Sequence, residues 1–109
     1  MKVAISVTAP KVNAAFESRF GRAAAFVIVD TETNDQEAFR NPAANAPGGA
    51  GVQAAEFLAG QGVDAVISGA FGPKAHNVLA AAGVRMYQAG GGKVAELVER
   101  LQQGALDPA

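Results

Sequence analysis

The chain has 109 residues, of which 50% are hydrophobic and 17% are charged. This composition predicts a single folded domain over residues 1–109 and excludes a wholly disordered chain. Nine Lys and Arg residues stand against ten Asp and Glu residues, so no global basic field exists to attract nucleic acid or anionic lipid. Cys is absent and His occurs once, which excludes disulfides, thiolate nucleophiles and metal sites built from several Cys or His ligands of one chain.

The N-terminal segment predicts a strand and gives no sign of a targeting signal. Its apolar stretch is too short for a secretory signal and alternates as a strand would. The longest fully apolar run, Ala23–Val29, is far shorter than the roughly 18 residues that a bilayer crossing requires. We therefore expect a cytoplasmic protein that makes no membrane contact.

Three strands are predicted in the first part of the chain. Apolar and small residues alternate over Val3–Thr8, as in a strand. The polar segment Ala9–Gly21 is long for a connection in a compact domain, so it is either a binding loop or an ordinary surface loop. Phe26–Asp30 and Glu37–Arg40 flank turn-forming residues and predict a hairpin.

Helices and strands alternate in the remainder of the chain. Pro, Gly and Asn residues in Asn41–Gly51 predict a loop, and a helix then extends to the glycines that follow Ala59. Ala65–Ser68 is a short apolar run, typical of a strand covered on both faces. Pro73 suits the first turn of a second helix, which Gly83 ends.

A strand over Val84–Tyr87 and an amphipathic helix over Val94–Gln103 complete the order β-β-β-α-β-α-β-α. The later strand–helix–strand units predict right-handed parallel crossovers, and the early hairpin adds an antiparallel part. We expect a three-layer α/β fold with a mixed five-stranded sheet and three helices distributed over both faces. Ribonuclease H-like and flavodoxin-like architectures have this arrangement.

Glycine-rich junctions lead into all three predicted helices, at Pro47–Gly51, Ser68–Pro73 and Ala89–Gly92. Helix N-termini favour anions, and the loop Ala9–Arg22 opens on the same edge if the first strand is parallel to the later ones. The same glycines also suit tight turns that bind nothing. The predicted binding residues at this edge are Asn13, Arg19, Arg22, Asn45, Gly72, Lys74, His76 and Gly91.

Patterns typical of enzymes and nucleotide-binding proteins are weak. Val94 follows Gly92-Lys93, so the magnesium-binding hydroxyl of a P-loop is missing. The spacing Gly49-x-Gly51-x-x-Ala54 is similar to a dinucleotide fingerprint but follows a long loop instead of a strand. The first strand has no carboxylate for a nuclease metal, and no nucleophile elbow supports a Ser/His/Asp triad. We therefore expect no enzyme activity.

His76 is the candidate metal ligand. It lies beside the apolar stripe of the second helix, within one turn of the helix start. A lone His in such a place is commonly a partly exposed surface residue. Imidazole nevertheless suits iron as a terminal ligand, and one ligand is enough to hold a preassembled cluster.

Two segments resemble a known family. They are Arg19–Asp30, which reads RFGRAAAFVIVD, and Val63–Val84, which contains SGAFGPKAH. This combination of FGRA and GxxGPxA resembles the dinitrogenase iron–molybdenum cofactor biosynthesis family, with its NifX-like and NifB C-terminal-like domains. The resemblance covers nearly the whole chain, as far as the tail at Gly104–Leu106. The residues that match the family's loop and helix start are Phe20, Gly21, Arg22, Ala23, Gly69, Gly72, Pro73 and Ala75.

The resemblance implies a ribonuclease H-like domain without nuclease activity. It also implies that the protein carries iron–sulfur precursors or the finished iron–molybdenum cofactor, with a protein partner in cofactor assembly. The chain departs from the family at Arg19, where members commonly place His, and in having no Cys. Arg can pair with an anionic cluster but cannot coordinate iron, which leaves His76 as the metal ligand.

Three functions therefore stay open. The first is a non-catalytic carrier for an anionic iron–sulfur-type metallocofactor. The second is a binding module for a small anionic metabolite or nucleotide, held at helix N-termini. The third is a protein–protein interaction module that uses the short third strand as an open sheet edge.

Overall fold

Six strands form one mixed sheet in the computed structural model, which describes residues 1–109. None of the three helices is long and apolar enough to cross a membrane. The strands are β1 (Lys2–Val7), β2 (Ala25–Asp30), β3 (Gln36–Arg40), β4 (Ala65–Ser68), β5 (Arg85–Gln88) and β6 (Asp107–Pro108). The helices are α1 (Ala50–Gly60), α2 (Pro73–Ala81) and α3 (Val94–Gln102).

The sheet order is β3-β2-β1-β4-β5-β6. The strands β1, β4 and β5 are parallel to one another, while β2 is antiparallel to both β1 and β3. The predicted hairpin and the predicted parallel part are therefore both confirmed. Because the carboxyl ends of parallel strands meet at one edge, the segments that follow β1, β4 and β5 emerge together there.

The sheet has six strands instead of the five expected. The extra strand, β6, pairs antiparallel with β5 through Tyr87↔Pro108 and Gln88↔Asp107. Two residues are too few to show an alternating pattern, and Pro is rare within a sheet. Pro108 is tolerated because an edge strand does not need its missing N–H. The ribonuclease H-like name stays a prediction.

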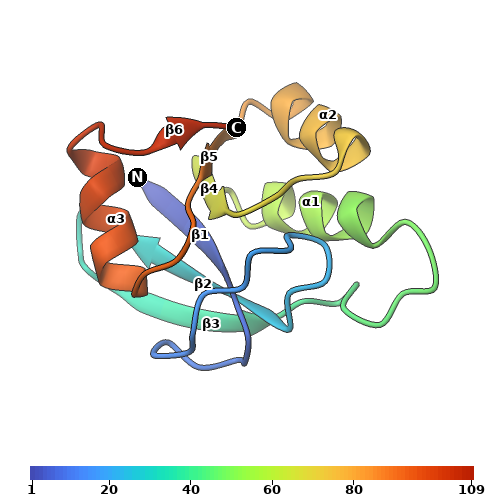
Figure 1. The fold of residues 1–109 in the computed structure, drawn as a ribbon, viewed down its shortest axis with the longest axis horizontal. Coiled ribbons are helices and arrows are strands. Elements are labelled where there is room, and N and C mark those ends of the chain that lie inside the picture. Colours follow the sequence, from blue (N-terminus) through green and yellow to red (C-terminus); the bar gives the residue numbers. More distant parts are fainter.

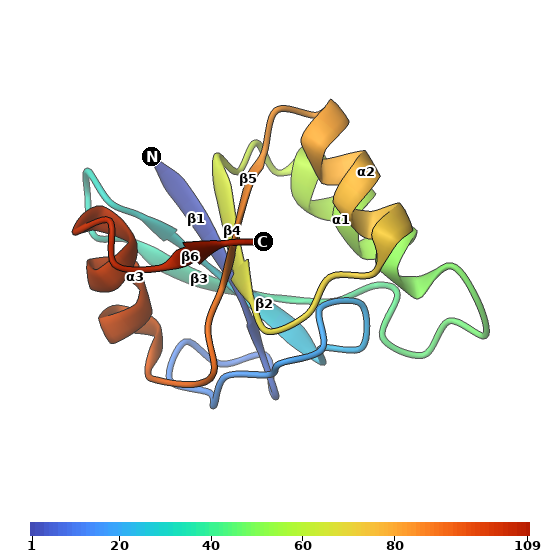
Figure 2. The same ribbon diagram turned by 45° about the horizontal axis from the view of Figure 1, so that its top comes forward.

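Helices cover both faces of the sheet, with α1 and α2 on one face and α3 on the other (Figures 1 and 2). Neighbouring residues of each strand point to opposite faces, so the core has two halves. Phe26 belongs to the buried cluster that contains Leu58 of α1. Val27, the next residue, belongs to the cluster that contains Leu97 of α3.

The loop between β1 and β2 is fixed to the strand ends at this edge. Phe16 forms an antiparallel bridge with Val7, and Arg19 forms a parallel bridge with Ala70 beyond β4. The buried Ser6 hydroxyl donates to the Glu17 carbonyl oxygen at 2.6 Å, and its oxygen lies 2.8 Å from that of the Ser68 hydroxyl. The loop is therefore held in place across the ends of β1 and β4.

Candidate functional site

A cleft of about 550 Å³ opens where the loop after β1 meets the starts of α1 and α2. We call it the arginine cleft. Three short segments and one further residue line it: residues 19–22, 49–52 and 72–75, together with Ala70. The outermost of these segments are more than 50 residues apart in the chain. The parallel arrangement of β1 and β4 brings residues 19–22 and 72–75 to one edge of the sheet, and close packing of Gly21 on Gly51 adds the start of α1.

Close backbone packing fixes the floor of the arginine cleft. A Cβ atom at Gly21 would lie 2.8 Å from the backbone nitrogen of Gly51, closer than real Cβ contacts come. A Cβ atom at Gly51 would in turn lie 3.3 Å from the Cβ atom of Ala75. Gly21 and Ala75, which belong to the family motifs, and Gly51 therefore allow the loop, α1 and α2 to approach one another.

Phe20 holds the loop to the hydrophobic core. Its side chain is buried, and its ring centroid lies 5.4 Å from that of Phe26 and 5.1 Å from that of Phe71. Aromatic pairs at such distances add to the stabilisation that comes from burial. Phe20 thus has a packing role, while its neighbour Arg22 faces solvent.

Asn41 holds the same loop from the β3 side, a role that the sequence pattern did not predict. Its buried side-chain nitrogen donates to the carbonyl oxygens of Gly21 at 3.2 Å and Ala23 at 3.0 Å. Its side-chain oxygen accepts from the Ala43 backbone N–H at 2.9 Å, as in an Asx turn. An Asn directly between a strand and Pro42 was the available signal for this turn.

Three cationic side chains and no carboxylate line the arginine cleft. Arg22 Nη1 donates to the Ala46 carbonyl oxygen at 2.7 Å, which directs its guanidinium toward the loop that precedes α1. Lys74 is exposed in the first turn of α2. Arg19 differs from these two cations because it forms a salt bridge with a carboxylate outside the lining: its Nη2 lies 3.2 Å from Glu17 Oε1. The hydrogen bond from the Arg19 side chain lowers the pKa of Glu17.

The starts of two helices add to the positive character of this cleft. Both α1 and α2 begin there, with Gly49 and Gly72 at their N-caps. Neither helix has a side-chain hydrogen bond at its N-cap or an acidic residue in its first turn. The first backbone N–H groups of a helix lack partners within the helix and favour an anion. The cleft therefore combines cations and N–H donors.

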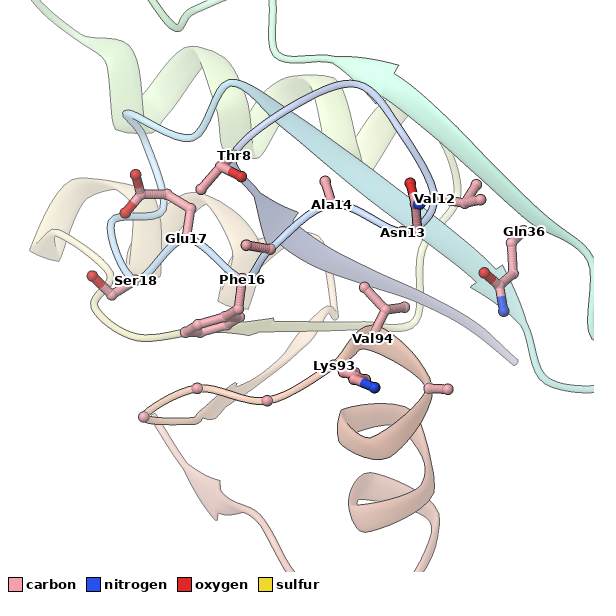
Figure 3. A pocket seen from close by; sticks show the side chains of 15 residues that line it. Thr8, Val12, Asn13, Ala14, Phe16, Glu17, Ser18, Gln36, Lys93 and Val94 are labelled. Atoms are coloured by element: carbon pink, nitrogen blue, oxygen red, sulfur yellow. The ribbon is translucent and has the colours of Figure 1, made fainter.

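A second, larger cleft of about 910 Å³ lies between the loop after β1 and the start of α3. We call it the Phe16 cleft. Figure 3 shows Ala14 and Phe16 from the loop opposite Val94 at the start of α3. Lys93 and Glu17 are its only charged lining residues, so their charges offset each other. The residues that line it are Thr8, Val12–Ser18, Gln36 and Gly90–Ala95.

The structure divides the predicted binding residues instead of gathering them at one shallow site. Four of them line the arginine cleft, two line the Phe16 cleft, and two line neither. The arginine cleft has Arg19, Arg22, Gly72 and Lys74. The Phe16 cleft has Asn13 and Gly91, while Asn45 and His76 line neither cleft. The reason is that different parts of the loop after β1 face different helices. Residues 12–18 face the start of α3, whereas residues 19–22 face the starts of α1 and α2.

His76 lies apart from both clefts. It follows Ala75 by one position, about 100° around α2, and Ala75 is buried in the floor of the arginine cleft. The His76 ring is half-buried, and its Nε2 lies 3.3 Å from the Ala109 carbonyl oxygen. No group of three or more His, Cys, Asp or Glu side chains is placed to hold a metal ion.

Comparison with known proteins agrees with the motifs at the arginine cleft. The family model described as "Dinitrogenase iron-molybdenum cofactor" matches residues 1–104. An uncharacterised protein of Methanocaldococcus jannaschii is 31% identical over 110 aligned residues, covering 98% of this chain and 90% of the relative.

Solved structures have the same fold. The apo form of the orange protein from Desulfovibrio gigas has a TM-score of 0.92 and 35% identity, covering 99% of this chain and 92% of the other. A Thermotoga protein provisionally assigned as NifB has a TM-score of 0.84 and 34% identity, and the match covers 98% of this chain and 91% of that protein. This chain belongs to the dinitrogenase iron–molybdenum cofactor family.

Proposed function

We propose that this protein holds an anionic metallocofactor of the iron–sulfur type in the arginine cleft and carries it chemically unchanged. The cargo is the iron–molybdenum cofactor or a precursor of it, which the family membership supports. The observation that carries the proposal is the cleft itself, where three cations and two helix starts meet without a carboxylate in the lining. A carrier role also implies a protein partner that supplies or receives the cofactor.

The donor set of the cleft fits a finished cluster better than one assembled on protein ligands. The chain has no Cys, and the cleft lining has neither imidazole nor carboxylate. Guanidinium, ammonium and backbone N–H groups donate hydrogen bonds to the outer atoms of an anion and do not coordinate iron. We therefore propose that the cleft residues hold the cluster by charge and hydrogen bonds, which leaves coordination of iron to His76, outside the cleft lining.

The same lining supports binding without catalysis. Its side chains are those of Arg, Lys, Phe, Val, Ala and Pro, besides glycine. The Lys74 amine is the only group among these that can serve as a general base or nucleophile, and no carboxylate, imidazole, hydroxyl or thiol accompanies it in the lining. Arg22 and Lys74 would bind and orient the anion, and Gly72 would present the start of α2.

The proposal is tested by anaerobic gel filtration of the protein with isolated iron–molybdenum cofactor, followed by iron and molybdenum analysis of the protein peak. We expect the metals to co-elute with the parent. Arg22→Gln should weaken binding about tenfold, as the loss of a charge-assisted hydrogen bond does. Arg100→Gln, which removes an exposed charge of α3 outside the cleft, is the control. Absence of metal in the parent peak would refute the proposal.

His76 stays a proposed terminal ligand to iron, and the same experiment tests it. To reach a cluster in the cleft, its ring would have to leave the Ala109 carbonyl oxygen. His76→Ala should abolish co-elution if imidazole ligation is essential. If His76→Ala retains the metals while Arg22→Gln loses them, charge and hydrogen bonding alone hold the cluster.

A small phosphate-bearing metabolite is the second candidate ligand, because helix starts and cations suit phosphate as well. Inorganic phosphate serves as the probe. If millimolar phosphate raises the melting temperature of the parent but not of Arg22→Gln, and the cofactor does not co-elute, binding of a phosphate-bearing metabolite replaces cofactor carriage as the proposed function.

A further inference from the structure

The chain passes from one cleft to the other within three residues. Glu17 and Ser18 line the Phe16 cleft, whereas Arg19 lines the arginine cleft. Glu17 and Arg19 are joined by their side chains across this boundary, with Arg19 Nη2 3.2 Å and Arg19 Nε 3.5 Å from the two carboxylate oxygens. The pair therefore stands in the wall that the two clefts share.

The two partners differ in how firmly they are held. The Glu17 backbone N–H donates to the Ser6 carbonyl oxygen at 2.9 Å, and its own carbonyl oxygen accepts from the Ser6 hydroxyl. The Glu17 carboxylate also accepts from the Arg19 backbone N–H at 3.0 Å. The Glu17 side chain is 16% exposed, whereas that of Arg19 is 71% exposed. The carboxylate is thus a fixed point, and the guanidinium is the part that can turn away.

Arg19 is also the only cation of the arginine cleft that has a carboxylate partner. The salt bridges of the molecule are that of Arg19 with Glu17 and that of the N-terminal amine with Glu32. Arg22 bonds to a carbonyl oxygen, which leaves its positive charge uncompensated. With the pair closed, the cleft presents two uncompensated cations; with the pair open, it presents three.

We propose that Glu17 sets the affinity of the arginine cleft by competing with the bound anion for the Arg19 guanidinium. This inference rests on the proposed function, because it concerns the same anion site. Glu17 is a positioning residue, since it lies outside the arginine cleft and acts through Arg19. Binding exchanges one ionic partner of Arg19 for another, so part of the attraction of Arg19 for the anion is offset by the bond to Glu17 that is lost.

The test is a set of anaerobic binding titrations of the cofactor with four variants. Glu17→Gln removes the competing charge but keeps an amide oxygen for the Arg19 backbone N–H. We expect it to bind about two- to fivefold more tightly than the parent, as expected from the strength of exposed ion pairs. Arg19→Gln should bind more weakly, and the double variant should bind no more tightly than Arg19→Gln. Circular dichroism checks that each variant is folded.

The fourth variant, Glu56→Gln, removes one negative charge from the exposed face of α1 without touching Arg19, and serves as the matched control. A gain in Glu56→Gln equal to that in Glu17→Gln, or a gain from Glu17→Gln that persists without Arg19, would overturn the inference. If the parent and Arg22→Gln behave as proposed but Glu17→Gln matches the parent, only this inference fails. If the parent binds no cofactor, both proposals fail.

Discussion

Arg19 and Arg22 are three positions apart and line the same cleft, yet their surroundings differ. Arg22 bonds to the Ala46 backbone, while Arg19 bonds to the Glu17 carboxylate. Two residues of one type therefore contribute unequally to the positive character of the cleft. Their partners follow from the backbone path of the loop, because the bridge between Arg19 and Ala70 fixes the backbone beside Arg19.

The first prediction concerns Gly21, which packs against the first turn of α1. Gly21→Ala should lower the free energy of unfolding by about 1–3 kcal/mol, because the new Cβ atom would press on the Gly51 backbone. Gly48→Ala is the matched control, since nothing lies within 4 Å of a Cβ atom there. Urea denaturation of both variants gives the comparison. Equal stability of the two variants would contradict the close packing of the loop on α1.

The second prediction concerns pH. Arg19 lowers the pKa of Glu17 in the folded state below its ordinary value of 4.5. The ion pair therefore stabilises the folded protein fully above that value, and the stabilisation is lost as pH falls through the lowered pKa. Glu17→Gln should be less stable than the parent at pH 7, and the difference should shrink as pH falls below 4.5 and the carboxylate of the parent becomes protonated. Denaturation curves at a series of pH values below 7 measure this difference. A difference that does not shrink as pH falls would show that the amide substitution acts by other means.

At the scale of elements, the two faces of the sheet are covered unequally. The first face has α1 and α2, whereas the second has α3 and the loop residues Ala14 and Phe16. The strands β1, β2 and β4 contribute side chains to both buried clusters. Because these strands connect the clusters, we propose that residues 1–109 unfold as one domain.

The third prediction tests this coupling with one helix residue from each face. Leu58→Ala and Leu97→Ala each remove a fully buried side chain and should each cost about 2–5 kcal/mol. Circular dichroism and Tyr87 fluorescence should report one coincident transition in both variants. Gln102→Ala, at an exposed position of α3, should change stability by less than about 0.5 kcal/mol. Two separate transitions would show that the faces unfold independently.

At the scale of the whole molecule, the net charge of −1 does not attract anions. Any electrostatic attraction must come from the local field of the arginine cleft, in which Arg22 and Lys74 have no carboxylate partner. Such a local field is sensitive to salt, because the cleft is open to solvent.

The fourth prediction follows from this screening. Affinity for the cofactor should fall steadily as ionic strength rises from about 0.01 M to about 1 M, where the Debye length shrinks from about 30 Å to 3 Å. Arg22→Gln should show a shallower dependence than the parent, and Arg100→Gln the same dependence as the parent. Titrations at several salt concentrations measure the slopes. Affinity that does not change with salt would indicate coordination by a protein ligand instead.

Local pattern was enough to predict most elements of the fold. The alternation in β1, the apolar run of β4 and the amphipathic spacing of α3 each reflect which side a residue must bury, and short stretches of sequence reveal that directly. The strand β6 was missed because two residues cannot show a period, and its existence depends on the exposed edge of β5. The FGRA and GxxGPxA motifs identified the family, which the comparison confirms.

The amino-acid sequence was sufficient for the order of every element except β6, for the family and for the kinds of side chain available: cations, glycines, one imidazole and no thiol. Which of these groups lie together depends on the packing of the folded chain. The fold places Arg22 and Lys74 in one cleft, places Asn13 and Gly91 in a second cleft, and sets His76 beside Ala109. The direction of a side chain near a helix start depends on how that helix packs. The helix α2 packs on α1, and α1 in turn packs against Gly21 of the loop after β1, so residues far apart in the chain set the direction of the side chains at the start of α2.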